Sequence, residues 1–267
     1  MSATGTSDVV LIEDLGGLRI VTLNRPDRLN AFNRDLFAGL QLALEAAAAD
    51  GGVNVVLLTG AGRAFSSGAD LSDMGRSRAP GEEPPPDREN PFDHLQAIAE
   101  AFPKPLVAAV NGLGVGLGFT ILGYCDFCFV ADSARLRTPF SQLGLSPEAS
   151  SSYLFPLRMG WAAAARALML GDWFSAQDLV DCGLAQEMVP DDRLMAVATE
   201  FAARLAACPQ QSLMATKSLM LQAHLPHIKA VRERERESLK ALVGTPANRE
   251  ALKAFAARKP APNSGAG

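Results

Sequence analysis

One acidic side chain in this sequence has no charged neighbours along the chain. Residues 138–160, TPFSQLGLSPEASSSYLFPLRMG, contain a single acid, Glu148, and the nearest formal charges are Arg137 on one side and Arg158 on the other. A carboxylate on a solvated surface usually has other charged residues near it in the sequence. In an apolar pocket, loss of hydration raises the pKa of such a group and makes it a stronger base. The competing interpretation is that Glu148 simply caps a helix over Ala149–Met159.

Two glycine-rich turns could supply hydrogen-bond donors to a ligand. They are TGAGRAFSSGADL (Thr59–Leu71) and NGLGVGLGFT (Asn111–Thr120), and each follows an apolar run of strand length. Glycine allows the backbone to adopt positive φ or to approach a ligand closely. If both turns aim a free N–H at one point, the pair would form an oxyanion hole. Taken singly, each is better explained as a tight turn that binds nothing, but the two turns together with the lone acid downstream favour a site.

Other catalytic arrangements fit the sequence poorly. The three histidines are His94, His224 and His227; the last two have no acidic ligand beside them, and no G-x-S-x-G elbow accompanies any of the three. The glycine run is neither a Walker phosphate loop nor a dinucleotide-binding fingerprint. Cys125 and Cys128 form a C-x-x-C without a second ligand pair at zinc spacing, so we interpret them as buried small hydrophobes. We therefore expect no metal.

Composition and charge indicate a globular chain without a nucleic-acid surface. The sequence has 267 residues, 48% hydrophobic and 20% charged, with a net charge of −4 and no basic stripe. No apolar run approaches the length of a membrane span. The start, MSATGTSDVV, lacks the features of a signal peptide, and the end, PNSGAG, is no peroxisomal address. These features predict a cytoplasmic protein.

Hydrophobic patterning predicts strands in the first half of the chain and helices in the second. The pattern around Gly16-Gly17 indicates a hairpin, and Asn33 is expected to cap a helix that ends near Asp50. Apolar runs predict buried strands at Val53–Gly60, Pro105–Val110 and Phe127–Val130, with a short strand within Leu184–Pro190. Helices are predicted at Trp161–Leu170, Ser175–Asp181, Asp191–Ala207, Gln210–Ala223, His227–Val243 and Ala247–Ala257.

Two charged segments are expected to lie on the surface. Gly75–Pro91 is rich in proline, glycine and charge, which predicts a mobile loop. RERERE (Arg232–Glu237) alternates in sign and is predicted to be a solvated helix face. The helical tail has enough apolar surface to pack on a neighbouring subunit.

Four segments together resemble the crotonase (enoyl-CoA hydratase/isomerase) superfamily, over nearly the whole chain. They are NRPDRLNAFN (Asn24–Asn33), GAGRAFSSGADL (Gly60–Leu71), KPLVAAVNGLGVGLG (Lys104–Gly118) and GDWFSAQDLVDCGLAQEMV (Gly171–Val189). The resemblance implies an α/β fold with a ββα spiral acyl-CoA-binding core over residues 1–200. It also implies a helical oligomerisation region over residues 201–267, with a homotrimer or a dimer of trimers as the assembly.

The resemblance further implies that the substrate is an acyl-CoA thioester and that no separate cofactor is required. The two N–H groups that bind the thioester oxygen match Ala69 and Leu117. Glycine is usual at the second position, but a main-chain donor tolerates leucine. The remaining residues matched to CoA binding are Arg28, Ala31, Ser67, Gly68, Asp70, Leu71 and Lys259.

Within the superfamily, the sequence is closest to the peroxisomal-type Δ3,Δ2-enoyl-CoA isomerases. The two catalytic glutamates of the hydratases match Thr120 and Phe140, neither of which is an acid or a base. The catalytic glutamate of these isomerases instead matches Glu148, in the sequence Ser146-Pro147-Glu148. The implied reaction is a double-bond shift in fatty-acid metabolism, in which one base removes a proton from C2 and returns it to C4.

Two further readings of the chain stay open. It could be a hydratase or another enzyme that acts through a CoA enolate, or it could be an acyl-CoA-binding module without turnover. An RNA-binding role finds no support in the negative net charge. Burial would raise the pKa of Glu148, whereas the dipole of a following helix would lower it, and the sequence does not decide between these effects.

Overall fold

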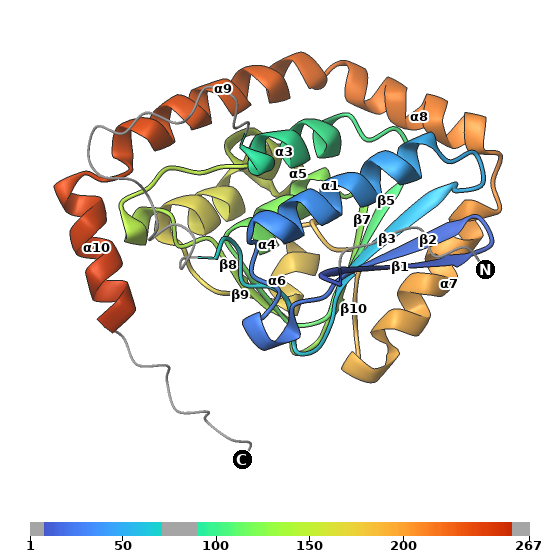
Figure 1. Cartoon of the computed structure of the whole chain (residues 1–267), viewed down its shortest axis with the longest axis horizontal. Coiled ribbons are helices and arrows are strands. Elements are labelled where there is room, and N and C mark those ends of the chain that lie inside the picture. Colours follow the sequence, from blue (N-terminus) through green and yellow to red (C-terminus); the bar gives the residue numbers. More distant parts are fainter. Residues whose placement is uncertain (1–7, 71–89, 258–267) are drawn as a thin grey trace.

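The structure is a computed structural model that describes residues 8–70 and 90–257 (Figure 1). Within these ranges, two β-sheets form the centre and helices surround them. The predicted loop at Gly75–Pro91 falls mostly outside the described residues. Its last two residues, Asn90 and Pro91, begin a helix, and the Asn90 side chain accepts a hydrogen bond from the Phe92 N–H.

The larger sheet has six strands in the order β1-β2-β3-β5-β7-β10. β1 and β2 pair antiparallel, as the hairpin predicted around Gly16-Gly17 requires, and every other neighbouring pair is parallel. β3 and β5 are buried along their whole length, which explains why they are apolar on both faces. The strands are β1 (Val10–Leu15), β2 (Leu18–Leu23), β3 (Val55–Gly60), β5 (Leu106–Val110), β7 (Phe127–Ala131) and β10 (Glu187–Val189).

A smaller sheet has four short strands in the order β4-β6-β8-β9. Its strands are β4 (Ala64–Ser66), β6 (Leu113–Val115), β8 (Arg135–Arg137) and β9 (Phe174–Ser175). β4, β6 and β8 each follow a strand of the larger sheet, so the chain alternates between the two sheets as it advances. This alternation agrees with the expected spiral, although hydrophobic patterning predicted none of the four strands.

Helices cover the sheets and form most of the chain after residue 190. They are α1 (Arg34–Ala49), α3 (Pro91–Glu100), α4 (Leu117–Thr120), α5 (Ser151–Ala165), α6 (Ala176–Asp181), α7 (Leu194–Ala206), α8 (Gln210–Gln222), α9 (Leu225–Leu242) and α10 (Pro246–Ala257). Short helical turns are η1 (Pro26–Arg28), η2 (Ile121–Tyr124), η3 (Ser141–Leu143), η4 (Arg166–Leu170) and η5 (Asp191–Arg193). The predicted cap of α1 is confirmed, because Asn33 Oδ1 accepts a hydrogen bond of 3.0 Å from the Leu36 N–H.

The C-terminal helices wrap one side of the sheets. α7 packs on β3, β5 and β7, whereas α9 contacts α5 and α10 contacts η3. In Figure 1, α8 and α9 form an arch over the rest of the chain. Residue 200, the predicted end of the core, lies within α7, so the helix that spans this boundary belongs to the packing of the larger sheet. In the described residues, no helix combines the length and the apolar character needed to cross a bilayer.

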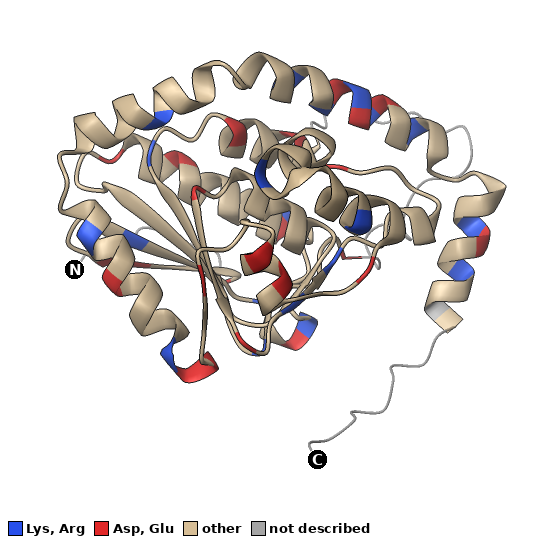
Figure 2. Cartoon of the chain, turned by 180° about the vertical axis from the view of Figure 1, so that it is seen from behind, with Lys and Arg blue, Asp and Glu red and all other residues tan. Residues whose placement is uncertain are grey.

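One predicted helix agrees with the structure, and one prediction about α9 is wrong in part. The backbone of α5 is broken at Gly160 (φ 77°, ψ 160°), and the segment after the break starts at Trp161 and continues through η4 to Leu170, the bounds of the predicted helix. RERERE is not uniformly solvated. The acids and bases do alternate along α9 (Figure 2), but Glu235 is only 6% exposed and Arg232 reaches Glu100 on α3.

Candidate active site

The two glycine-rich turns meet, as predicted, and they do so through backbone contacts that leave no room for side chains. A Cβ on Gly118 would lie 2.1 Å from the Ser66 carbonyl oxygen, and one on Gly68 would lie 2.5 Å from the Val115 carbonyl oxygen. Gly68 also has φ +83°, a conformation that suits glycine. β4 and β6 hold the turns together, because these strands pair in parallel. The glycines are therefore needed for close approach of one turn to the other.

Each turn contributes one unused N–H near this contact. Leu117 begins α4, so its N–H has no partner within the helix, and Ala69 lies in an exposed position just after Gly68. Neither N–H donates to an acceptor in the part of the chain that the structure describes. A Cβ on Gly68 would lie 3.5 Å from the Leu117 nitrogen, which places the two donors on neighbouring segments. The arrangement can bind an oxygen that carries negative charge.

Glu148 lies in the loop between η3 and α5, and its carboxylate faces α4. Glu148 Oε1 accepts a hydrogen bond of 2.7 Å from the Thr120 hydroxyl. As a whole residue Glu148 is half-buried, while its carboxyl group is enclosed by protein atoms. Because Thr120 and Leu117 belong to the same helical turn, this contact brings the carboxylate to the element that carries one of the free N–H donors.

The environment of Glu148 favours a base that works near neutral pH. Burial raises the pKa of Glu148 to about 8, while the Thr120 hydrogen bond opposes the shift and the negative charge of Glu235 adds to it. Loss of hydration therefore outweighs the effects that favour the charged form. A carboxyl group with this pKa can take up and release a proton within the physiological range.

The alternative role of Glu148 as a helix cap does not match the structure. The helix begins at Ser151, its N-cap residue is Ser150, and no side chain of that residue caps it. The main-chain carbonyl of Glu148 accepts hydrogen bonds from the Ser151 N–H (3.1 Å) and hydroxyl (2.6 Å). The Glu148 carboxylate itself points to Thr120 and stays available for chemistry.

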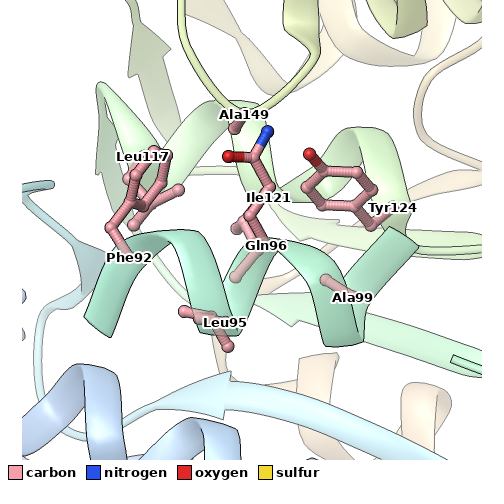
Figure 3. A pocket seen from close by; sticks show the side chains of 8 residues that line it. All are labelled: Phe92, Leu95, Gln96, Ala99, Leu117, Ile121, Tyr124 and Ala149. Atoms are coloured by element: carbon pink, nitrogen blue, oxygen red, sulfur yellow. The ribbon is translucent and has the colours of Figure 1, made fainter. Parts of the chain in front are cut away.

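A small pocket of about 10 Å³, room for roughly one water molecule, lies beside these groups (Figure 3). Leu117 and Ala149 line it, so it borders both a free N–H donor and the residue after Glu148. The lining is otherwise apolar except for Gln96 and Tyr124. The Tyr124 hydroxyl is buried close to Gln96 and Ser150, without a hydrogen bond of good geometry to either. The lining residues are Phe92, Leu95, Gln96, Ala99, Leu117, Ile121, Tyr124 and Ala149. The apolar lining is chemically suited to a hydrocarbon chain, but the space is too small for one, so binding an acyl chain here requires the lining residues to move apart.

The residues predicted to contact CoA lie in two segments that touch each other. The Ala31 N–H donates to the Arg28 carbonyl (3.0 Å), and the Ser67 hydroxyl donates to the same carbonyl at 3.4 Å. The Arg28 side chain is exposed. Gly68 accepts from the Phe32 N–H at 2.8 Å, which ties the segments together. Leu71 and Lys259, also predicted to contact CoA, lie outside the described residues.

Arg25 organises this region, and the sequence did not single it out. Its guanidinium donates to the Ala31 carbonyl and forms an ion pair of 3.2 Å with Asp70, another predicted contact. The backbone at Leu29 and Asn30 is left-handed, with φ of 51° and 53°. The buried Asn30 side chain supports that shape, because it donates to the Ala61 and Ala64 carbonyls and accepts from the Arg25 N–H.

Sequence reasoning also missed a buried acid on α9. Glu235 accepts hydrogen bonds from the N–H groups of Ser150 and Ser152, at the start of α5. The spacing of residues along α9 could have indicated that Glu235 is buried. Ile228, Val231 and Glu235 are spaced three and four residues apart, so they share one face of the helix, and all three are buried.

The cysteine pair lies in the core, as predicted. Cys125 and Cys128 are both fully buried, and the Cys125 thiol contacts the Ile121 carbonyl. Among residues 8–70 and 90–257, no cluster of three or more histidine, cysteine or acidic side chains is arranged to hold a metal ion.

Comparisons with known proteins identify the family of the chain. The family model for enoyl-CoA hydratase/isomerase matches residues 13–265. The chain is 36% identical over 254 residues to enoyl-CoA delta isomerase 2 of Rattus norvegicus, an alignment that covers 94% of this chain and 64% of that protein. The chain thus spans less than two thirds of that relative's length.

A second relative is named as a hydratase and not as an isomerase. The chain is 31% identical to the 2,3-dehydroadipyl-CoA hydratase of Escherichia coli K12, and the alignment covers 88% of this chain and 91% of that protein. Among solved structures, an enoyl-CoA hydratase/isomerase from Pseudoalteromonas atlantica superposes with a TM-score of 0.87 at 31% identity. That match covers 95% of this chain and 99% of the other. Relatives therefore include both isomerases and hydratases.

Proposed function

The chain belongs to the enoyl-CoA hydratase/isomerase family, and on that premise we propose that it is a Δ3,Δ2-enoyl-CoA isomerase in fatty-acid metabolism. The observation that carries the proposal is the enclosed carboxylate of Glu148, which is hydrogen-bonded to Thr120 beside a small apolar pocket. A double-bond shift requires one base that gives back the proton it takes. Hydration requires, in addition, a bound water and a group that activates it.

The proposed reaction begins with a 3-enoyl thioester bound so that its C2 lies beside Glu148. The Glu148 carboxylate removes a proton from C2, and the electrons of the C–H bond delocalise over the thioester carbonyl and the C3–C4 double bond. The N–H groups of Ala69 and Leu117 stabilise the negative charge on the thioester oxygen. Glu148 then returns the proton to C4, which leaves a trans-2-enoyl thioester. A positioned base typically contributes ~10²–10⁴-fold to rate, and one oxyanion donor ~10²–10³-fold.

The other buried acids near Glu148 have structural partners that argue against a second catalytic carboxylate. Glu100 pairs with Arg232 at 3.0 Å, and both oxygens of Glu235 accept main-chain N–H groups. Phe140, at the second position matched to a hydratase glutamate, is a buried apolar side chain. Within the described residues, then, water near C3 would find no second acid or base to activate it.

The substitution Glu148→Gln tests this proposal. It keeps the size of the side chain and its ability to accept from Thr120 but removes the base. We expect turnover of a 3-enoyl-CoA to fall by about 10²-fold or more, while the Kd of an acyl-CoA changes little. Glu237→Gln, at an exposed site on α9, is the matched control. Isomerisation that survives Glu148→Gln within a few-fold would contradict the mechanism.

A hydratase is the second candidate, because a relative of nearly equal length is named as one. Steady conversion of crotonyl-CoA to its 3-hydroxy product at ordinary enzyme rates would favour hydration over isomerisation. Saturable acyl-CoA binding without change in the double bond would instead indicate a binding module without turnover. Product analysis with 2-enoyl- and 3-enoyl-CoA separates the three.

The assembly that we propose is a homotrimer or a dimer of trimers, in the cytoplasm and without a cofactor beyond the CoA of the substrate. Large apolar side chains on the surface of the single chain support association. They include Trp161 (74% exposed), Leu219 (72%) and Met220 (68%). Burial of such side chains against another copy would be favourable. Light scattering coupled to size-exclusion chromatography measures the assembly directly.

A further inference from the structure

The two residues after Glu148 have an unusual backbone conformation. Ala149 has φ +58° and Ser150 has φ +54°, so both are left-handed although neither is glycine. This conformation is sterically unfavourable for an L-residue, because Cβ approaches the following carbonyl oxygen. Two in succession persist only where surrounding groups hold them. The turn they form directly follows Glu148 and so constrains the position of the Glu148 backbone.

Glu235 holds this turn from a distant helix. Its Oε2 accepts a hydrogen bond of 2.7 Å from the Ser150 N–H, and its Oε1 accepts one of 2.8 Å from the Ser152 N–H. Ser150 is the N-cap residue of α5 and makes no side-chain cap bond of its own. Glu235 therefore satisfies two donors at the start of α5 that would otherwise be unpaired in the interior.

Neighbouring polar groups fix the same turn from another side. The Ser150 hydroxyl accepts from Gln96 Nε2 and donates to Glu100 Oε1, both at 3.2 Å. Glu100 in turn pairs with Arg232, one turn before Glu235 on α9. Because α3 and α9 both contribute, the turn is held by long-range packing and not by local sequence.

We propose that Glu235 is a positioning residue, which holds the Ala149–Ser150 turn so that the Glu148 carboxylate meets Thr120. This inference rests on the proposed role of Glu148 as the base. Both Glu235 oxygens are occupied by N–H donors, so Glu235 acts through Glu148 and does not itself transfer the proton.

Glu235 also acts on Glu148 through its charge. The negative charge of Glu235 raises the pKa of Glu148, in the same direction as burial. Burial likewise raises the pKa of Glu235, and its hydrogen bonds from Ser152 and Ser150 oppose that shift. The other titratable or charged groups that face this cluster from neighbouring elements are Glu100 on α3, Tyr124 on η2, and Lys229, Arg232 and Arg234 on α9.

Two substitutions of Glu235 separate the geometric effect from the electrostatic one. Glu235→Ala removes both acceptors, and we expect kcat on a 3-enoyl-CoA to fall about 100-fold, as misplacement of a reacting group by ~1 Å can cause. KM should change by less than about threefold, because the CoA-binding segments lie elsewhere. Glu235→Gln keeps one acceptor and removes the charge. Glu235→Gln should lower kcat less than Glu235→Ala does. It should also shift the midpoint of the pH–rate profile to lower pH, because the charge that raises the pKa of Glu148 is gone. Glu237→Gln, on the same helix but exposed, should leave both quantities unchanged.

Crystal structures of the wild type and both Glu235 variants test the geometry without substrate. We expect Glu235→Ala to lose the left-handed turn and the Glu148–Thr120 hydrogen bond. A folded Glu235→Ala variant that keeps both, or a Glu235→Gln variant with wild-type kcat and pH midpoint, would overturn the inference. If the wild type fails to isomerise 3-enoyl-CoA while Glu235→Ala still displaces Glu148, the proposed function fails and the positioning role stands. If Glu235→Ala does not fold, the Glu235→Gln kinetics and structure decide.

Discussion

The Thr120 hydroxyl donates a hydrogen bond of 2.7 Å to Glu148 Oε1 across 28 residues of sequence. By resemblance, hydratases carry a glutamate at the position of Thr120. In this chain, the Thr120 hydroxyl instead donates to the Glu148 carboxylate, which faces α4. The pair thus combines a base with a neutral donor that favours its charged form. Its chemistry depends on the protonation state of Glu148, which makes pH the first variable to test.

The rate of isomerisation should rise with pH up to about 8. The base is the ionised form of Glu148, whose pKa burial raises to about 8. Below that pH, kcat/KM should fall about tenfold per pH unit, because the free enzyme is increasingly protonated. Initial rates from pH 6 to 9.5 with a 3-enoyl-CoA measure this, with enzyme stability checked at each pH. A profile that is flat between pH 6 and 8 would argue against Glu148 as the base.

Thr120→Val should slow the enzyme at pH 7. The substitution removes a donor to a charged group, an interaction worth about 1.5–3 kcal/mol. The pKa of Glu148 should therefore rise further, and its midpoint in the pH–rate profile should move upward. Thr120→Ser keeps the hydroxyl and is the matched control. Equal profiles for the Val and Ser variants would indicate that the hydrogen bond does not influence the base.

Gly118→Ala should disrupt the contact between the two turns. The new Cβ would lie 2.1 Å from the Ser66 carbonyl oxygen, so the Ala69 and Leu117 donors would move apart. Loss of one oxyanion donor alone costs ~10²–10³-fold in kcat. Gly51→Ala is the control, since its Cβ would have nothing within 4 Å. We expect a lower Tm and a large loss of kcat for Gly118→Ala, and near wild-type values for both quantities in Gly51→Ala. Wild-type kcat in Gly118→Ala would contradict the proposed oxyanion site.

Glu148→Gln should stabilise the folded protein at alkaline pH. The folded-state pKa of about 8 lies above the ordinary value of 4.5, so the folded state binds more protons than the unfolded state between these pH values. Stability contributed by this group is thus lost as pH rises across that window. Removing the charge should recover on the order of 4 kcal/mol at pH 8 and little at pH 4.5. Thermal melting at both pH values measures the difference, and an equal Tm for the variant and wild type at pH 8 would contradict a destabilised carboxylate.

Much of the larger sheet could be predicted because its signals are local. β3, β5 and β7 appear as apolar runs, and the Asn33 cap and the Gly16-Gly17 turn mark the ends of elements. The smaller sheet escaped prediction because its strands are two or three residues long, too short to display a period. The break of α5 at Gly160 follows from a local signal, because glycine interrupts the helical pattern, whereas the left-handed turn at Ala149 and Ser150 before the helix has no such signal.

For the candidate site, the sequence by itself determined the components: an acid without charged neighbours, two glycine-rich turns and a family resemblance. These are properties of composition and spacing, and so they can be read along the chain. Only the tertiary structure decided the partners of Glu148, because Thr120 and Glu235 reach that loop from α4 and from α9. The alternating charges of α9 predicted a solvated face, but the packing of α9 on α5 buried Glu235 where two N–H groups needed an acceptor. Which surfaces pack together depends on the whole fold, and that packing determines the environment in which the carboxyl group of Glu148 ionises.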